Sequence, residues 1–464
     1  MILHAPLTKK HWKNIPVLIL GLGQYPSGSG VSAALMFAKL GANVTVTDQK
    51  SAKELSKNVS RLKKYKNVRF VMGRHDLADI DRAKLIVANP RVRPSSEEMK
   101  RARKKGIPVV SDISLFLDNC PATVIGVTGT RGKSTTSTLI AAMLKASKKR
   151  VWLGGNILVS PLTFVSRVKK NDIVVLELSS WQCESLPMTS RPPHISVVTN
   201  MMRDHLNTYQ GMDDYAEAKA QIFRHQKPND MVIFNADDAY GKRWIQEASG
   251  TVLSFGKKGM DAKILNGALC FGSSKVIDLY DMKLIGEHNA MNALAAMLAA
   301  GAAGATSSGI THVLKTFSGL ENRLQTISKR KGITWINDTT ATTPDGAIAA
   351  FKALHDRHCI LWFIMGGSDK KLDYAELGKV FASSKRVGIF LLPGDASKKM
   401  IKVFKRHSIA YEEVSSMKMA VQRAREVASS GDAVILSPAA ASFGLFKNEF
   451  DRGEQFVTMI RRIK

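Results

Sequence analysis

Cysteine is scarce in this sequence, and its scarcity excludes two classes of site. The 464 residues include only four cysteines, which stand far apart, at Cys120, Cys183, Cys270 and Cys359. Zinc sites and dithiol redox motifs need cysteines paired at short spacing, so neither is expected. We predict reduced, mostly buried thiols.

Long apolar runs are also absent. No run approaches the ~18 apolar residues that a membrane-spanning helix needs. Residues 1–14 are too polar and too interrupted for a secretory signal. The sequence therefore predicts a cytoplasmic protein with no membrane partner.

Acidic residues are few relative to basic ones. The sequence contains 39 Asp and Glu and 68 Lys and Arg, which gives a formal net charge of +29. Such a charge favours anionic partners, so nucleic acid is a rival to phosphorylated small molecules. The basic residues are dispersed, without a stripe interleaved with aromatics. This pattern favours a generally basic, solvated surface over a nucleic-acid site.

The rest of the sequence is organised around residues 123–145. A β-branched run at 123–127 predicts a buried strand, Gly129 and Gly132 interrupt it, and apolar residues then recur at helical spacing from Ser134. Strand, glycine loop and helix in this order form an anion site, because loop N–H groups and the helix N-terminus surround phosphate oxygens.

The residues that follow the loop indicate a nucleotide triphosphate. Lys133 would bridge the β- and γ-phosphates, and Ser134 or Thr135 would offer a hydroxyl to Mg²⁺. Five residues separate Gly126 from Gly132, whereas the strict phosphate-loop pattern has four. The stretch is therefore a variant of the motif, and an ordinary glycine-rich turn is the alternative.

A second glycine loop lies near the start of the sequence. An apolar strand at 16–20 leads into Gly21 and Gly23, a helix is predicted at 31–40, and Asp48 ends a strand at 44–47. This order fits a dinucleotide-type unit, in which the loop holds a diphosphate and the acid meets a ribose. A plain strand-to-helix turn is the alternative.

Polar residues follow several later strands. Glu177 lies inside an apolar strand, where a carboxylate is costly to bury unless it meets a cation, so a Mg²⁺ ligand is the natural interpretation. His205 and Lys219 could equally be ordinary surface or core residues. Asn289 and Asn292 lie three apart at a helix start, and capping is the alternative role for Asn289.

The alternation of strands and helices predicts an α/β protein of three domains. We expect a Rossmann-like domain at 1–117, a phosphate-loop domain with a mostly parallel sheet at 118–319 and a second Rossmann-like domain at 320–464. Ligands should bind at the carboxyl ends of the strands.

With these motifs in order, the chain resembles the Mur ligases of cell-wall precursor synthesis along essentially its whole length. Seven groups of residues carry the resemblance: 128–135, 154–156, 177–180, 204–205, 287–289, 337–338, and 436–442 followed by 446–448. The resemblance implies an ATP-dependent amide ligase that works through an acyl phosphate. Its implied partners are ATP, UDP-N-acetylmuramoyl-L-alanine and D-glutamate, and we expect a monomer.

The resemblance also implies roles for individual residues. Lys133, His205 and Lys219 are the implied catalytic residues. Two Mg²⁺ sites are implied, the first with Ser134 and Glu177 and the second with His205 and a Lys219 that CO₂ has carbamylated. ATP contacts are implied for Gly129, Thr130, Arg131, Gly132, Lys133, Ser134, Thr135, Asn289, Asn292, Arg323 and Asp338. The UDP-sugar would contact Gly21, Gly23, Asp48, Asn89 and Asn156, and the amino acid would contact Thr342, Lys370 and Ser442.

The sequence departs from the resembling enzymes at a few positions. Arg131 replaces an asparagine, and Thr340 replaces a lysine that would supply a cation for a dicarboxylic amino acid. A ligase for a different amino acid is therefore one alternative, and a basic, nucleic-acid-binding phosphate-loop ATPase is another. A folylpolyglutamate-type ligase lacks the first domain, so residues 16–30 argue against it.

Overall fold

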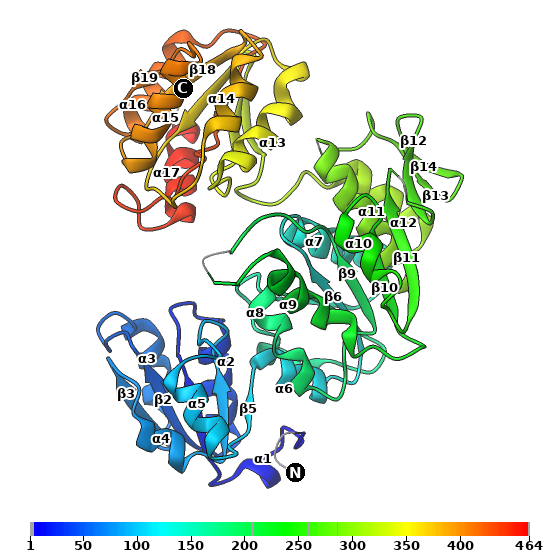
Figure 1. Cartoon of the computed structure of the whole chain (residues 1–464), viewed down its shortest axis with the longest axis vertical. Coiled ribbons are helices and arrows are strands. Elements are labelled where there is room, and N and C mark those ends of the chain that lie inside the picture. The colour runs from blue at the N-terminus through cyan, green and yellow to red at the C-terminus, as the bar shows by residue number, and fades with distance from the viewer. Residues whose placement is uncertain (1–3, 206–207, 258, 285, 463–464) are drawn as a thin grey trace. The chain divides into compact units, whose positions relative to one another are not determined.

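The computed structural model describes residues 4–205, 208–257, 259–284 and 286–462 (Figure 1). Three separate sheets follow one another along the chain, each built mainly from parallel strands. This confirms the expected α/β architecture. Within the described residues, no helix is both long and apolar enough to cross a membrane.

The first sheet is entirely parallel, with strand order β3-β2-β1-β4-β5. Its strands are β1 (Pro16–Leu20), β2 (Asn43–Asp48), β3 (Val68–Met72), β4 (Leu85–Ala88) and β5 (Val109–Val110). The accompanying helices are α1 (Lys9–Trp12), α2 (Ser29–Lys39), α3 (Ser56–Lys63), α4 (Leu77–Arg82), α5 (Glu97–Lys104) and α6 (Asp112–Asn119). The strand order reverses at β1, so the loop after β1 opens where ligands of such sheets bind.

The second sheet has nine strands in the order β14-β13-β12-β11-β10-β9-β6-β8-β7. Its strands are β6 (Thr123–Thr128), β7 (Val151–Gly155), β8 (Ile173–Glu177), β9 (Ile195–Val198), β10 (Met231–Asn235), β11 (Thr251–Gly256), β12 (Ala262–Leu265), β13 (Ala268–Phe271) and β14 (Ser274–Asp278). Its helices are α7 (Lys133–Ala146), η1 (Pro161–Thr163), η2 (Val165–Arg167), α8 (Ser180–Cys183), η3 (Leu186–Met188), α9 (Met212–Arg224), α10 (Ala239–Trp244), α11 (Glu287–Ala302) and α12 (Ser307–Thr316). Strands β12 to β14 pair antiparallel, and the others pair parallel, as expected for a mostly parallel sheet.

The third sheet has six strands in the order β15-β16-β20-β17-β18-β19, with only the β15–β16 pair antiparallel. Its strands are β15 (Gln325–Arg330), β16 (Ile333–Asn337), β17 (Leu361–Met365), β18 (Val387–Leu391), β19 (Glu412–Glu413) and β20 (Ala433–Leu436). Its helices are α13 (Pro344–Leu354), η4 (His355–Arg357), α14 (Ala375–Ala382), α15 (Asp395–Arg406), α16 (Met417–Val427) and α17 (Glu449–Arg461).

Burial explains why the strands could be predicted from the sequence. Strands β6 and β8 are buried along almost their whole length, as expected when helices cover both faces of a parallel sheet. Helices α2 and α7 begin earlier than predicted, at Ser29 and Lys133. The four cysteines are free, and all but Cys359 are buried, as predicted.

The chain forms two compact units. The first contains Met1–Asp281 and Met291–Lys315, with the first two sheets, and the second contains Met282–Ala290 and Thr316–Lys464, with the third sheet. The exact domain limits at 117 and 319 stay predictions.

Candidate active site

The phosphate loop joins β6 to α7 through two glycines with positive φ. Gly129 has φ +135° and Gly132 has φ +83°, a region that L side chains rarely adopt. A Cβ on Gly129 would lie only 2.0 Å from the Thr199 hydroxyl oxygen. These two glycines therefore let the chain turn tightly at the N-terminus of α7, the end of a helix that attracts anions.

The segment after β9 holds the loop from one side. The backbone N–H of Thr130 donates to the Asn200 carbonyl, and that of Arg131 donates to Asn200 Oδ1, both at 2.9 Å. The Thr199 hydroxyl donates to the Arg131 carbonyl at 2.6 Å. The loop is thus fixed by bonds from the segment that directly follows β9, the strand beside β6 in the sheet.

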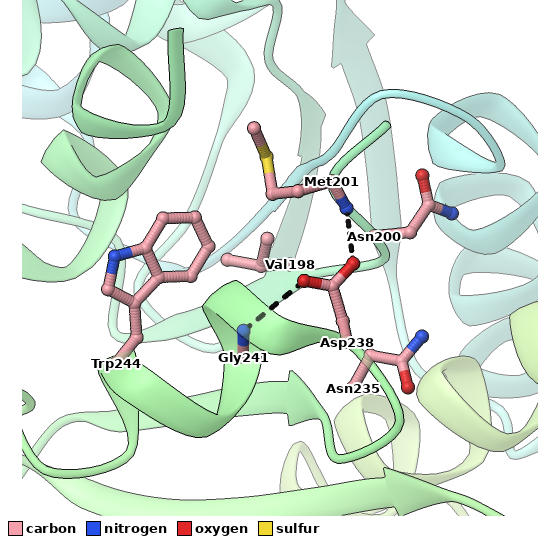
Figure 2. Close-up of a pocket in the computed structure, with 7 residues that line it drawn as sticks. All are labelled: Val198, Asn200, Met201, Asn235, Asp238, Gly241 and Trp244. Atoms are coloured by element: carbon pink, nitrogen blue, oxygen red, sulfur yellow. Dashed lines mark hydrogen bonds between the residues drawn. The ribbon is translucent and has the colours of Figure 1, made fainter. Parts of the chain in front are cut away.

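A small pocket next to this segment contains the groups that fix it in turn (Figure 2). Asp238 accepts from the backbone N–H of Met201 at 2.7 Å and caps α10 through the N–H groups of Tyr240 and Gly241. Asn235 Nδ2 donates to the Thr199 carbonyl at 3.1 Å. The pocket residues therefore support the phosphate loop through the Thr199–Asn200 segment.

Two lysine ammonium groups converge on one carbonyl of the loop. Lys133 Nζ donates to the Gly129 and Thr130 carbonyls at 3.0 Å, and Lys219 Nζ donates to the Gly129 carbonyl at 2.8 Å. Lys219 is 1% exposed. Burial, followed by the nearby charge of Lys133, lowers the pKa of Lys219 to about 7. The structure thus brings together two of the three predicted catalytic residues.

Glu177 ends β8 as a buried carboxylate with one unsatisfied oxygen. Asn156 Nδ2 donates to Glu177 Oε1 at 2.9 Å, whereas the buried Oε2 accepts no hydrogen bond from any described residue. A buried carboxylate oxygen without a donor is costly unless a cation binds it. This orphaned oxygen fits a hard metal ion such as Mg²⁺. The described residues include no group of three or more His, Cys, Asp or Glu that could form a complete metal site.

His205 lies in a ring cluster beside the loop and has φ +55°. Its ring centre is 5.3 Å from that of Trp181 and 5.9 Å from that of Tyr215. Burial lowers the pKa of His205, and neighbouring Asp204 opposes that effect. Asp204 Oδ2 also lies 3.6 Å from Arg131 Nη1. Arg131, which replaces the asparagine of the resembling enzymes, therefore pairs with Asp204, the residue before His205.

The two predicted asparagines of α11 have different surroundings. Asn292 lies against the phosphate loop: a Cβ on Gly132 would be 2.1 Å from its Oδ1, and the Thr136 hydroxyl is 3.5 Å from the same atom. Asn289 is also buried, and it belongs to the second unit. Asn292 therefore supports the loop, a role that its position in the sequence did not indicate.

The N-terminal glycine loop, which follows β1 and contains Gly21 and Gly23, closes on Asp48 at the end of β2. The backbone N–H groups of Gly23 and Lys50 donate to the two oxygens of Asp48, both at 2.9 Å. Asn89 Nδ2 lies 3.4 Å from the Gly21 carbonyl. Four of the five predicted UDP-sugar residues are thus gathered here. The fifth, Asn156, lies instead beside Glu177 at the second sheet.

Gly30 is a functional candidate that the sequence reasoning missed. A Cβ at this position would lie 2.2 Å from the Gly21 carbonyl oxygen and 2.5 Å from that of Leu22. Gly30 therefore lets α2 pack directly onto the loop, the task of the third glycine in dinucleotide folds. The signal was a glycine in the first turn of the helix, hidden by the longer loop before it.

In the second unit, the carboxyl end of β16 carries Asp338. Its two oxygens accept from the Ser437 hydroxyl at 2.8 Å and from the Leu324 N–H at 3.1 Å. Burial raises the pKa of Asp338 to about 7, and the charge of Arg323 opposes the rise. Asp338 and Arg323, both predicted ATP contacts, therefore lie in one electrostatic neighbourhood.

Two of the predicted amino-acid contacts also meet in this unit. Lys370 Nζ donates to the Thr342 hydroxyl at 2.9 Å. Ser442 is buried, and its carbonyl accepts from the Phe446 N–H at 3.2 Å. The Thr340 hydroxyl, at the position of the missing lysine, donates to the Asn322 carbonyl at 2.8 Å.

Arg452 of α17 is a second residue that the sequence reasoning missed. Its side chain is fully buried and donates to the hydroxyl and carbonyl of Thr339 at 3.0 and 2.9 Å and to the Ala440 carbonyl at 3.2 Å. Burial lowers the pKa of this guanidinium to about 10. Arg452 thus ties together the loops after β16 and β20, which carry Thr342 and Ser442. An arginine in an amphipathic helix gives no such signal in the sequence.

Comparison with family models gives three consecutive matches. The N-terminal domain described as Mur ligase MurD-like matches residues 16–111, the Mur ligase middle domain matches 127–300, and the Mur ligase glutamate ligase domain matches 322–440.

Curated relatives match nearly the full length of the chain. A UDP-N-acetylmuramoylalanine–D-glutamate ligase of Borreliella afzelii (strain PKo) is 36% identical over 97% of this chain and 98% of its own length. A ligase of the same name from Roseiflexus sp. (strain RS-1) is 34% identical over 95% of this chain and 97% of its own length.

Solved structures share the fold at lower identity. The UDP-N-acetylmuramate-alanine ligase MurC of Thermotoga maritima aligns with a TM-score of 0.62 and 19% identity over 97% of this chain and all of its own. The MurF ligase of Thermotoga maritima, solved in complex with ADP, aligns with a TM-score of 0.60 and 17% identity over 100% of this chain and 98% of its own.

Proposed function

The chain belongs to the Mur ligase family, and from this premise we propose that it joins D-glutamate to UDP-N-acetylmuramoyl-L-alanine at the expense of ATP. Relatives of 34–36% identity that carry the corresponding name support this substrate pair. The observation that carries the proposal is the convergence of Lys133 and Lys219 on the Gly129 carbonyl, beside a strand that ends in Glu177.

ATP binds with its phosphates on the loop between β6 and α7. The positive end of α7 and Lys133 stabilise the charge that develops on the transferred phosphoryl group. Lys133 is already near the loop, because its ammonium group contacts the Gly129 and Thr130 carbonyls. ATP would compete for this ammonium group when it binds.

Mg²⁺ would be held by Glu177 together with Ser134, and a second ion by His205 and a carbamylated Lys219. The support is the buried, unsatisfied Oε2 of Glu177. CO₂ adds only to a neutral amine, forming an N–C bond and releasing a proton, and the lowered pKa of Lys219 favours the neutral form. When bound, the ions would neutralise phosphate charge during transfer.

The reaction proceeds through an activated acid. The terminal carboxylate of the UDP-sugar attacks the γ-phosphorus of ATP, and ADP leaves. The amine of D-glutamate then attacks the acyl phosphate, and phosphate leaves from a tetrahedral intermediate. The UDP-sugar is bound by the Gly21 to Gly30 loop with Asp48 and Asn89, and Asn156 lies toward the reacting end. D-glutamate is bound by Thr342, Lys370 and Ser442. Asn292 adds an ATP contact beside the phosphate loop, and the ATP contacts of Asn289, Arg323 and Asp338 stay predictions.

A phosphate-release assay on the full chain tests this function. Turnover should require ATP, Mg²⁺, UDP-N-acetylmuramoyl-L-alanine and an amino acid together, and D-glutamate should be preferred in a panel of amino acids. Preference for another amino acid would contradict D-glutamate as the substrate. That alternative is worth testing because Thr340 lacks the cation that a lysine would supply. Stimulation of ATP turnover by DNA or RNA alone would contradict the ligase and favour a nucleic-acid role for the +29 charge. Cytoplasmic location and a monomeric state stay predictions.

A further inference from the structure

A continuous series of cation–π and ring contacts joins the domain of the first sheet to the phosphate loop. It begins at Arg93, on the loop after β4, whose guanidinium carbon lies 4.6 Å from the Trp181 ring centre. The series continues through the rings of His205 and Tyr215 and ends at Lys219 Nζ, which lies 4.7 Å from the Tyr215 ring centre. Arg93 and Lys219 thus occupy the two ends of a row with His205 in its middle.

Arg93 is also fixed by a directional contact. Its Nη2 donates to the Thr208 hydroxyl at 2.9 Å, although the two residues are 115 positions apart in the sequence. Thr208 belongs to the same segment as His205, since its backbone N–H donates to the His205 carbonyl at 2.8 Å. One guanidinium therefore contacts both the ring that packs on His205 and the segment that carries His205.

Trp181 is held in this row by ring contacts, with Arg93 over its ring and the tilted ring of His205 beside it. Its buried indole N–H has no hydrogen-bond partner among the described residues, although buried tryptophans usually find one. A planar guanidinium over an indole face is a favourable cation–π contact. The cation–π contact therefore accounts for the position of Trp181 where hydrogen bonding does not.

We propose that Arg93 and Trp181 are positioning residues, which hold His205 beside the phosphate loop and tie it to the loop that carries the UDP-sugar contact Asn89. Neither residue touches the reacting atoms in this scheme. The proposal rests on the ligase function for its kinetic consequences, and the physical contact can be tested without that function.

The kinetic test compares Arg93→Ala with Arg91→Ala, which removes the same charge from an exposed side chain of the same loop. We expect Arg93→Ala to lower kcat by about 3- to 30-fold, with the KM for ATP and the calorimetric Kd for UDP-N-acetylmuramoyl-L-alanine unchanged. Arg93→Lys should recover only part of the loss, because an ammonium group lacks the planar face. Arg91→Ala should match the unsubstituted chain. Weakened UDP-sugar binding at unchanged kcat would make Arg93 a substrate ligand and overturn the proposal.

A double-substitution cycle and fluorescence test the contact itself. Arg93→Ala combined with Trp181→Leu should lower kcat no further than either change alone, whereas additive losses would overturn the coupling. Arg93→Ala should alter the tryptophan fluorescence of the chain, and in a Trp181→Phe background it should not. An identical spectral change in both backgrounds would overturn the contact. Lack of turnover by the unsubstituted chain would instead refute the ligase function and leave the spectral result standing.

Discussion

The ammonium group of Lys219 lies 2.8 Å from the carbonyl oxygen of Gly129, so a buried cation on α9 contacts the first residue of the phosphate loop. The carbonyl is neutral, and the charge with the largest effect on the pKa of Lys219 is the like charge of Lys133. The protein therefore keeps an amine in a place where its charged form is poorly stabilised. Conversion to a carbamate would reverse the sign of that charge.

Replacement of Lys219 by alanine should lower ligase activity by roughly 100-fold or more, because the proposed second Mg²⁺ site would lose a ligand. Acetate or propionate should restore part of the activity by supplying a carboxylate to the space left by the side chain. The measurement is phosphate release with and without these acids. Lys227→Ala, at an exposed position beyond α9, is the control and should keep full activity. Full activity of Lys219→Ala without additives would remove the carbamate role.

Replacement of Lys133 by alanine should reduce ATP-dependent product formation by roughly 100- to 1,000-fold, since the loop would lose the cation that the proposed function assigns to the transferred phosphoryl group. The exposed Lys145 at the other end of α7 provides the matched control, and Lys145→Ala should have normal kinetics. Product formation is followed with ATP, UDP-N-acetylmuramoyl-L-alanine and D-glutamate all saturating. Normal turnover by Lys133→Ala would refute the phosphate-loop assignment.

Replacement of Gly30 by alanine should weaken binding of UDP-N-acetylmuramoyl-L-alanine by about tenfold or more. The added methyl group would collide with two backbone carbonyls, which can retreat only if the loop deforms. Gly28→Ala is the control with a smaller steric clash, because its Cβ would lie 3.2 Å from the nearest atom, the Tyr25 carbonyl oxygen. Calorimetric titration without ATP measures both. Equal affinity of the two variants would contradict the role assigned to Gly30.

Stability of the second unit should respond to pH through Asp338. The pKa of this carboxyl is raised to about 7 in the folded chain, above the unfolded value of about 3.9. The folded state therefore binds more protons between these values, and the contribution to stability is lost as pH rises toward 7. Calorimetry should find that the melting temperature of the native chain, relative to Asp338→Asn, falls between pH 5 and pH 7.5. The exposed Asp345 supplies the control, because Asp345→Asn should leave the pH profile unchanged.

Arg452→Met should destabilise the second unit by about 2–5 kcal/mol, because three acceptors in two loops lose their donor at once. Binding of D-glutamate should weaken in parallel, since these loops carry Thr342 and Ser442. Arg461 is exposed on the same helix, and Arg461→Met should leave the melting temperature unchanged. Thermal unfolding compares the two variants. Equal melting temperatures would show that Arg452 does not hold the loops.

The sequence predicted those features that depend on local pattern. Parallel strands with two covered faces give apolar runs, and the Gly–Lys–Ser order after β6 is typical of a phosphate site, so both could be predicted. The supporting roles of Gly30, Asn292 and Arg452 could not be predicted, although the resemblance implies an ATP contact for Asn292, because each acts on a loop from a distant or differently patterned segment. Their roles depend on backbone atoms that only the folded chain brings near.

One of these distant contacts bears on the order in which the protein folds. The hydroxyl of Thr136 and the side chain of Asn292 are 156 residues apart in the chain, yet they meet under the phosphate loop. Closing so long a loop is entropically slow compared with forming the adjoining helix. During synthesis, the phosphate loop therefore acquires its contact with Asn292 only after α11 has been made. A chain truncated before that helix would carry the intact phosphate-loop sequence on an incomplete site.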